Sequence, residues 1–200
     1  YYDLMEMKVS EGVASFNSEL QNDPIDPENA TFNPEWFDYY EPLEVDFKNP
    51  EFVFVGTNDP SLGKNKKSDT SAIVNLALSL KTGYMYVADA SIEKRKPDII
   101  IDDAFNLNRR LRRDYNRGFH KFGVETVQFQ YFFKEVMAQR SAEQGEYLPI
   151  EEIQSTVNKA LRIESLQPVI KNKYLKFNRE HKTLLKQLED IKYYQVPREL

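Results

Sequence analysis

The sequence has no cysteine and only two histidines among its 200 residues. Without cysteine, disulfides, zinc–thiolate sites and thiol catalysis are excluded. The two histidines, His120 and His181, are too few for a histidine-rich metal site, and they argue against a histidine-based catalytic triad. A metal site in this chain must therefore be built from carboxylates, whose oxygen atoms suit hard divalent cations.

Long apolar stretches are also missing. No run approaches the roughly 20 residues that a helix needs to cross a membrane. The first residues do not combine a charged stretch with an apolar one, so no signal peptide is visible. We therefore expect no membrane partner. The chain does not begin with methionine, and we expect it to be a fragment of a longer protein.

Positive charge is scarce at one end only. Residues 1–50 carry 2 Lys/Arg against 12 Asp/Glu, whereas residues 51–200 carry 25 against 20. The acidity behind the overall net charge of −5 thus belongs to the N-terminal segment. The larger part is mildly basic, which permits a DNA partner without requiring one.

Composition also divides the chain at residue 50. Residues 1–50 contain repeated turn signals, in which Asp or Asn precedes Pro, and aromatic residues too numerous for a free linker. We expect an acidic, aromatic-rich connector that leads from an absent domain and lies over a neighbouring one. Residues 51–200 then form a single folded domain.

The pattern beyond residue 50 predicts alternating strands and helices. Strands are predicted at 52–57, 71–80, 84–88, 122–125, around 148–153 and at 174–177. Helices are predicted from Pro97 to near Gly118, then at 129–140, 158–170 and 180–190. Short connections make the first three strands antiparallel. Three antiparallel strands, a crossover helix and a parallel strand predict an α/β fold with a mixed sheet, in the topology of the ribonuclease H-like fold.

A phosphate-binding loop is excluded near Gly56. The motif needs four residues between its glycines and a Ser or Thr after its lysine. Here six residues separate Gly56 from Gly63, and Asn65 follows Lys64. We therefore expect no nucleotide in this domain.

Two acids stand where predicted strands end. Asp59 lies just after the first strand, on the side of Val55 and Thr57, and Glu125 ends the fourth. Asn58-Asp59-Pro60 is also a good turn sequence, and Glu125 could be an exposed charge at a strand end. In the predicted sheet, however, these strands are neighbours, so the two acids converge. Paired carboxylates are what a two-metal site of Mg²⁺ or Mn²⁺ requires.

Several segments, in order along nearly the whole chain, resemble the nuclease domain of phage terminase large subunits. They are Ala14-Ser15-Phe16-Asn17-Ser18-Glu19 with Asn22-Asp23-Pro24, the run Gly56 to Lys64, Lys67 to Val74, Gly83 to Ala90, Val124-Glu125 with Phe129-Gln130, and Asn158-Lys159, Arg162-Ile163, Leu166 and Pro168. The resemblance implies a ribonuclease H-like fold and a metal-dependent endonuclease.

The resemblance also implies roles for individual residues. Asp59 and Glu125 match the family's first two catalytic, metal-binding acids, and Asp69 is a further candidate ligand. Lys159 and Arg162 fall inside a family-like segment and are candidate DNA-binding residues. Lys64, Lys66 and Lys67 are candidates for another reason, because they lie close to Asp59 in sequence and their charge suits a phosphate backbone, although they could equally belong to a solvated loop. The family's third acid normally lies in a segment after the last helix, and no such segment occurs before Leu200. Its absence puts the activity of these residues alone in question.

The implied function is cleavage of concatemeric double-stranded viral DNA during genome packaging, in the cytoplasm of the bacterial host. The family implies three partners in the full protein: an ATPase domain, a small terminase subunit and a portal ring. Two alternatives remain open on the sequence. One is another ribonuclease H-like nuclease, such as a transposase or a junction resolvase. The other is a non-catalytic docking module of the packaging motor.

Overall fold

The computed structural model describes residues 32–60, 70–125, 130–153 and 159–191. The chain forms two compact units. The central unit is Tyr40–Ser155, and the terminal unit combines Tyr1–Tyr39 with Thr156–Leu200. The terminal unit is therefore discontinuous in sequence.

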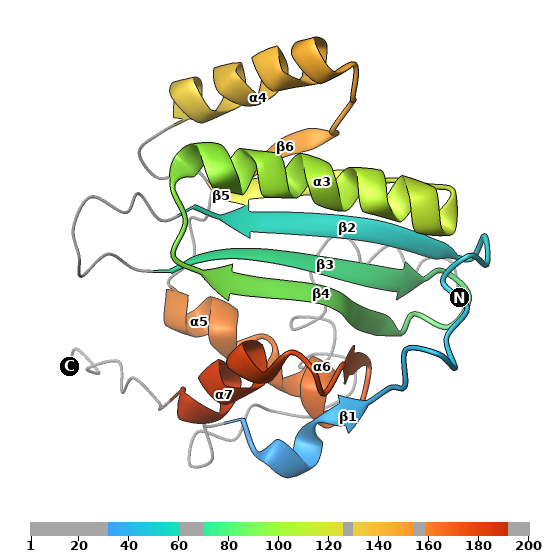
Figure 1. Ribbon diagram of the computed structural model, residues 1–200. Helices are drawn as coiled ribbons and strands as arrows, with labels where there is room; N and C mark the ends of the chain where they lie inside the picture. The colour runs from blue at the N-terminus through green and yellow to red at the C-terminus, as the bar shows by residue number, and fades with distance from the viewer. Residues whose placement is uncertain (1–31, 61–69, 126–129, 154–158, 192–200) are drawn as a thin grey trace, which may run out of the picture. The chain divides into compact units, whose positions relative to one another are not determined.

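The central unit is built on a mixed sheet with the strand order β4-β3-β2-β5-β6 (Figure 1). Its strands are β2 (Phe52–Asp59), β3 (Ser71–Ser79), β4 (Met85–Glu93), β5 (Lys121–Glu125) and β6 (Ile150–Ile153). β2, β3 and β4 are antiparallel neighbours, whereas β5 runs parallel to both β2 and β6. The predicted α/β architecture, with three antiparallel strands followed by parallel ones, is confirmed.

Two helices connect the later strands of this unit. α3 (Pro97–Tyr115) leads from β4 to β5, and α4 (Gln130–Gln144) leads from β5 to β6. Pro97 suits the first turn of α3 because its fixed φ is already helical and its missing N–H has no partner there. The helix ends before the predicted Gly118. Its C-cap is Asn116, a residue type that tolerates the left-handed φ of 57° found there.

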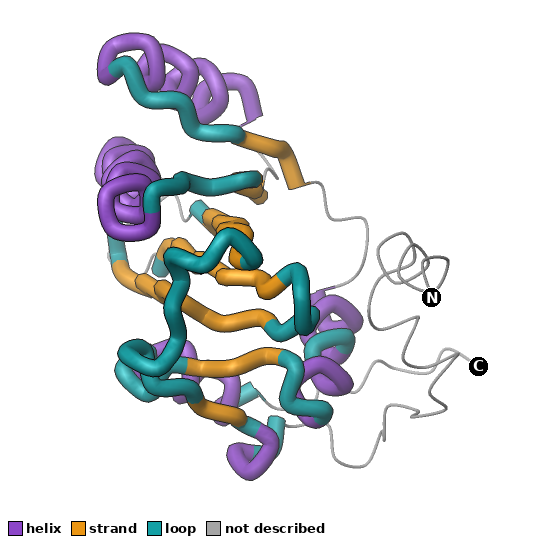
Figure 2. The backbone as a smooth tube through the Cα atoms, turned by 90° about the vertical axis from the view of Figure 1, so that its right-hand side faces the viewer, coloured by secondary structure: helices purple, strands orange, loops and turns teal. Residues whose placement is uncertain are grey.

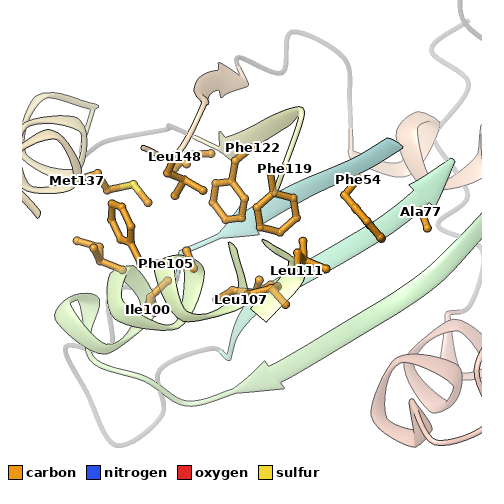
Figure 3. Close-up of a cluster of buried hydrophobic side chains, with 14 of the residues drawn as sticks. Phe54, Ala77, Ile100, Phe105, Leu107, Leu111, Phe119, Phe122, Met137 and Leu148 are labelled. Atoms are coloured by element: carbon orange, nitrogen blue, oxygen red, sulfur yellow. The ribbon is translucent and has the colours of Figure 1, made fainter. Parts of the chain in front are cut away.

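α3 covers one face of the sheet, as Figure 2 shows. The helix turns a row of apolar side chains toward the strands at the spacing that the sequence predicted. Figure 3 shows how these side chains meet those of the strands. The buried core includes Phe54, Ile73, Ala77, Ile100, Ala104, Phe105, Leu111, Phe122, Val124, Met137 and Leu148. We call this side of the sheet the packed face.

Part of the N-terminal segment belongs to the same core. The Tyr40 hydroxyl donates a hydrogen bond to the Val87 carbonyl over 3.0 Å. The Tyr40 ring meets Phe47 and Tyr86 edge-to-face, with centroids 6.0 and 5.2 Å apart. Burial, with a smaller contribution from the Asp89 carboxylate, raises the pKa of Tyr40 far above its usual range. Tyr40 and Phe47 therefore pack as core residues.

A β-bulge in β4 changes which way its side chains point. Asn75 of β3 pairs with Asp89, but the next residue, Leu76, pairs with Val87, so Ala88 is left over. The extra residue reverses the alternation of side chains along the strand. Tyr86 and Asp89 consequently both lie on the packed face, although regular alternation would place them on opposite faces.

The described part of the terminal unit pairs two segments that are far apart in the sequence. β1 (Asp38–Tyr39) follows the short helix η2 (Pro34–Trp36) and runs parallel to β7 (Leu175–Phe177). Phe37 packs on Phe177 with ring centroids 5.2 Å apart. The Lys176 ammonium lies 2.5 Å from the Asp38 carboxylate, and the Arg179 guanidinium lies 3.9 Å from the centre of the Tyr39 ring.

The remaining helices are α5 (Lys159–Glu164), α6 (Gln167–Lys171) and α7 (Lys182–Asp190). The sequence predicted one helix over 158–170, and the structure divides it into α5 and α6. Pro168 explains the break, because a proline ring clashes with the carbonyl four residues earlier, which is that of Glu164. Among the described residues, no helix is both long and apolar enough to span a membrane.

Candidate functional site

β2 and β5 bring Asp59 and Glu125 together. The two strands run parallel, and Asn58 pairs with Val124 in their register. The next residue on each strand is its last one, Asp59 and Glu125. Residues paired in a sheet point to the same side, and neighbouring strands lie about 4.8 Å apart. Asp59 and Glu125 therefore lie at neighbouring strand ends on the same side of the sheet, as the sequence predicted.

The acids lie on the side of the sheet opposite the packed face. Asn58 is buried, whereas its neighbours Thr57 and Asp59 are exposed, as the alternation of a strand requires. We call this side the acid face. On the same face, two residues before the acids on each strand, Thr57 pairs with Gly123 of β5.

Gly56 and Gly123 each leave room for a side chain of a neighbouring residue, on opposite faces of the sheet. A Cβ on Gly56 would point into the packed face, 2.5 Å from Cδ2 of Phe122 and 2.7 Å from Cε1 of Phe119. A Cβ on Gly123 would point into the acid face, where Cδ1 of Ile153 lies 2.2 Å away. Because Ile153 pairs with Glu125, an apolar side chain of β6 flanks the carboxylate pair on one side.

The carboxylates fit a divalent cation in their chemistry. Mg²⁺ and Mn²⁺ take oxygen ligands, and a carboxylate pair at adjacent strand ends supplies them from a rigid support. In the described ranges, no group of three or more His, Cys, Asp or Glu side chains is arranged to hold a metal ion. Within that part of the chain, Asp59 and Glu125 would supply two oxygen ligands of a set that is incomplete.

The other predicted site residues fall in two groups. Asp69, Lys64, Lys66 and Lys67 lie outside the described residues. Lys159 and Arg162 lie in α5 of the terminal unit, three residues apart and therefore on one side of that helix. The Lys159 side chain is exposed, and that of Arg162 is half-buried.

Asp89 has a structural place. The β4 bulge turns its carboxylate onto the packed face, where it accepts a hydrogen bond from Nδ2 of Asn75 at 2.9 Å. The same carboxylate forms an ion pair with Arg110 of α3. Asp89 thus joins the sheet to the helix on the side away from Asp59.

The arginines of α3 and its following loop also have local partners. Arg112 pairs with Glu146 over 3.4 Å, and Arg113 pairs with Asp114 over 2.7 Å. Arg117 donates to backbone carbonyls, among them those of Asn49 and Phe52 at 2.9 and 3.0 Å. Arg95, which the sequence did not single out, is a buried cation that pairs with Asp103 over 2.8 Å. These contacts bind the basic side chains to neighbouring residues of the central unit.

Thr57, Gly123 and Ile153 lie around the acids, and the sequence did not single them out. The alternation that places Asp59 on the acid face also places Thr57 there, so Thr57 was open to prediction. Gly123 and Ile153 meet only through the register of β5 with β6. A one-residue slip in that register would send Ile153 to the other face.

Comparison with known proteins identifies the fold. No protein-family model and no curated protein sequence matches the chain. Solved structures do match. The human cytomegalovirus terminase nuclease domain, soaked with manganese and bound to an inhibitor, is 12% identical with a TM-score of 0.57, covering 76% of this chain and 82% of its own.

Two further matches are terminases. The P22 large terminase nuclease domain is 10% identical with a TM-score of 0.53, over 82% of each chain. The large terminase of a thermophilic bacteriophage, in complex with ADP, is 11% identical with a TM-score of 0.51. That match covers 79% of this chain and 35% of the bacteriophage protein.

The fold and the aligned strand-end acids define the chain as a ribonuclease H-like α/β domain. Within that class, its fold is that of the terminase large subunit nuclease domains. The resemblance that the sequence motifs indicated is confirmed at the level of the fold.

Proposed function

We propose that this chain is a divalent-metal-dependent endonuclease that cuts concatemeric double-stranded viral DNA during genome packaging. The observation that carries the proposal is the parallel register of β2 and β5, which aligns Asp59 with Glu125 on the acid face. The terminase nuclease fold supports it independently.

In this proposal Asp59 and Glu125 hold Mg²⁺ or Mn²⁺, and Asp69 is a further candidate ligand. When bound there, such cations would supply Lewis acidity for phosphodiester hydrolysis. The cytomegalovirus domain was soaked with manganese, which supports this choice of cation. The role of the two side chains is to fix the position of positive charge, since two bare carboxylates repel a phosphodiester.

DNA binding is assigned to Lys64, Lys66, Lys67, Lys159 and Arg162. Contacts from such residues to phosphates add affinity without reading base edges. Cleavage should therefore show little sequence preference and should weaken as the salt concentration rises. The fold likeness extends the proposal to an ATPase domain in the same protein, and to a small terminase subunit and a portal ring as partners in the host cytoplasm.

The test is cleavage of supercoiled plasmid with Mn²⁺, Mg²⁺ or EDTA. The native chain is compared with Asp59→Asn and Glu125→Gln, which remove charge and keep shape. Glu44→Gln is the matched control, because it removes one exposed carboxylate of the central unit away from the acids. We expect metal-dependent nicking in the native chain and the control, and none in the two site variants.

Three results would count against the proposal. Nicking that survives in both site variants would mean that other residues carry it. A native chain that neither nicks DNA nor binds Mn²⁺ would instead favour a docking module. Metal-dependent cleavage of only branched DNA or transposon ends would point to the resolvase or transposase alternative.

A further inference from the structure

Ile153 occupies the space that a side chain at position 123 would fill. A Cβ on Gly123 would lie 2.2 Å from Cδ1 and 2.9 Å from Cγ1 of Ile153, closer than real Cβ atoms approach. The isoleucine of β6 therefore leans across β5 at the one residue that has no side chain. Any other residue at position 123 would displace it.

This contact lies beside Glu125. Ile153 is the register partner of Glu125, and Gly123 is the partner of Glu151 two residues earlier on each strand. A Cβ added to Gly123 would point at Ile153, so the isoleucine side chain stands on the acid face with Glu125. Ile153 therefore stands on the β6 side of the glutamate and extends toward Gly123.

The position of Ile153 restricts where the Glu125 carboxylate can go. A carboxylate that turned toward β6 would lose water against the apolar side chain of Ile153, which is costly. This cost favours directions toward Asp59 on β2 and past the end of the strand. Both of these directions lead to the place where a cation held by the two acids would lie.

We propose that Ile153, seated over Gly123, is a positioning residue that holds the Glu125 carboxylate toward Asp59 for metal binding. This inference rests on the proposed function, because it gives Glu125 a ligand's task. Ile153 does not touch the cation. It acts through Glu125, in the way that outer residues orient the ligands of metal sites.

The first part of the test separates positioning from packing. Ile153→Ala removes the side chain from the acid face. Ile150→Ala is the matched control, because Ile150 lies on the same strand but pairs with Phe122 and packs against the core. Mn²⁺ affinity is measured by calorimetry on folded protein, with the melting temperature recorded in parallel. We expect Ile153→Ala to weaken Mn²⁺ binding about 10-fold, and Ile150→Ala to lower the melting temperature without changing the affinity.

The second part restores the contact from the other side. Gly123→Ala should push Ile153 aside and weaken Mn²⁺ binding. Adding Ile153→Val removes the δ-methyl and lets the new alanine methyl take its place. The double variant should therefore bind Mn²⁺ within about threefold of the native protein, a range well inside the 10-fold loss expected for Ile153→Ala. In metal-free protein, a nuclear Overhauser effect between the Ile153 δ-methyl and the Gly123 α-protons should report the same contact.

The outcomes distinguish this inference from the proposed function. If Ile153→Ala and Ile150→Ala change Mn²⁺ affinity equally, or if the double variant binds no better than Gly123→Ala, Ile153 only packs. In that case Asp59 and Glu125 still stand as ligands, provided that Glu125→Gln abolishes binding. If the native chain binds no Mn²⁺, or if Glu125→Gln binds it normally, the proposed function fails and the role of Ile153 fails with it.

Discussion

Carboxylates have different surroundings on the two faces of the central sheet. On the packed face, the Asp89 carboxylate is held by Asn75 and by Arg110. On the acid face, Asp59 stands exposed beside Glu125 at the strand ends. A carboxylate buried against a helix needs partners to offset lost hydration, and those partners fix it as part of the framework. The face of the sheet, rather than the residue type, separates a structural acid from a candidate catalytic one.

The largest expected effect comes from replacing the Asp59 carboxylate of the acid face with an amide. Asp59→Asn should reduce cleavage about 10³-fold, because metal-based stabilisation of the transition state is worth several kcal/mol, and the melting temperature should hardly change. Plasmid cleavage and thermal unfolding of the same samples check both halves. A variant that lost activity only in proportion to its lost folded fraction would place Asp59 with the structural acids.

The two glycines predict a smaller contrast, in stability. Gly56→Ala would force a methyl between the rings of Phe119 and Phe122, and should cost about 2 kcal/mol of unfolding free energy. Gly123→Ala displaces only the end of the half-exposed Ile153 side chain and should cost less than about 1 kcal/mol. Urea unfolding of both variants measures the difference. Equal losses would mean that the acid face is packed as tightly as the opposite face.

Asp89→Asn tests the structural acid directly. The variant keeps the shape of the side chain but leaves Arg110 without its anionic partner. It should lower the unfolding free energy by about 1 kcal/mol, since Arg110 is half-exposed and gains some hydration in return. Cleavage per folded molecule should stay at the native level. A loss of activity in fully folded Asp89→Asn would break the division between the two faces.

The smallest effect concerns Tyr40 and depends on pH. Burial and the Asp89 carboxylate raise the pKa of Tyr40 far above that of a tyrosine in the unfolded chain, which is near 10. The folded protein thus keeps this proton where the unfolded chain loses it, so the stabilisation is complete below about pH 10 and declines above it.

Tyr40→Phe loses the hydrogen bond to the Val87 carbonyl and should cost about 1 kcal/mol at neutral pH. Above about pH 10, the difference between the variant and the native chain should shrink, because only the native chain has this proton to lose from its unfolded state. Urea unfolding at neutral pH and at about pH 11 checks the sign. A difference that grew with pH would contradict it.

Local patterns predicted much of this fold. The apolar spacing of α3 and the buried run of β2 were readable because each element carries its own periodicity. The adjacency of β2 and β5 followed from the topology, and it brought Asp59 and Glu125 to neighbouring strand ends as expected. The sequence did not predict the irregularity in a strand, or the contacts between side chains of neighbouring strands.

The β4 bulge is the clearest example. From Tyr86, strict alternation places Asp89 on the acid face, and only the leftover Ala88 moves it to the packed one. A single extra residue in a strand leaves no periodic signal. The contact between Ile153 and Gly123 likewise depends on how β6 aligns with β5, which separate segments of sequence do not encode locally. The break in the helix at Pro168 was readable from proline chemistry, and the predicted single helix over 158–170 overlooked it.

The pairing of β1 with β7 has a consequence for the order in which parts of the chain fold. Asp38 and Lys176 are 138 residues apart in sequence, and the whole central unit is encoded between them. A chain made from its N-terminus cannot form this pair until β7 has been synthesised, and closing so long a loop carries an entropic cost that slows folding. The central unit, whose paired strands are closer in sequence, can fold first. We therefore expect residues 34–39 to be among the first of the described residues to be synthesised and among the last to gain protection from hydrogen exchange.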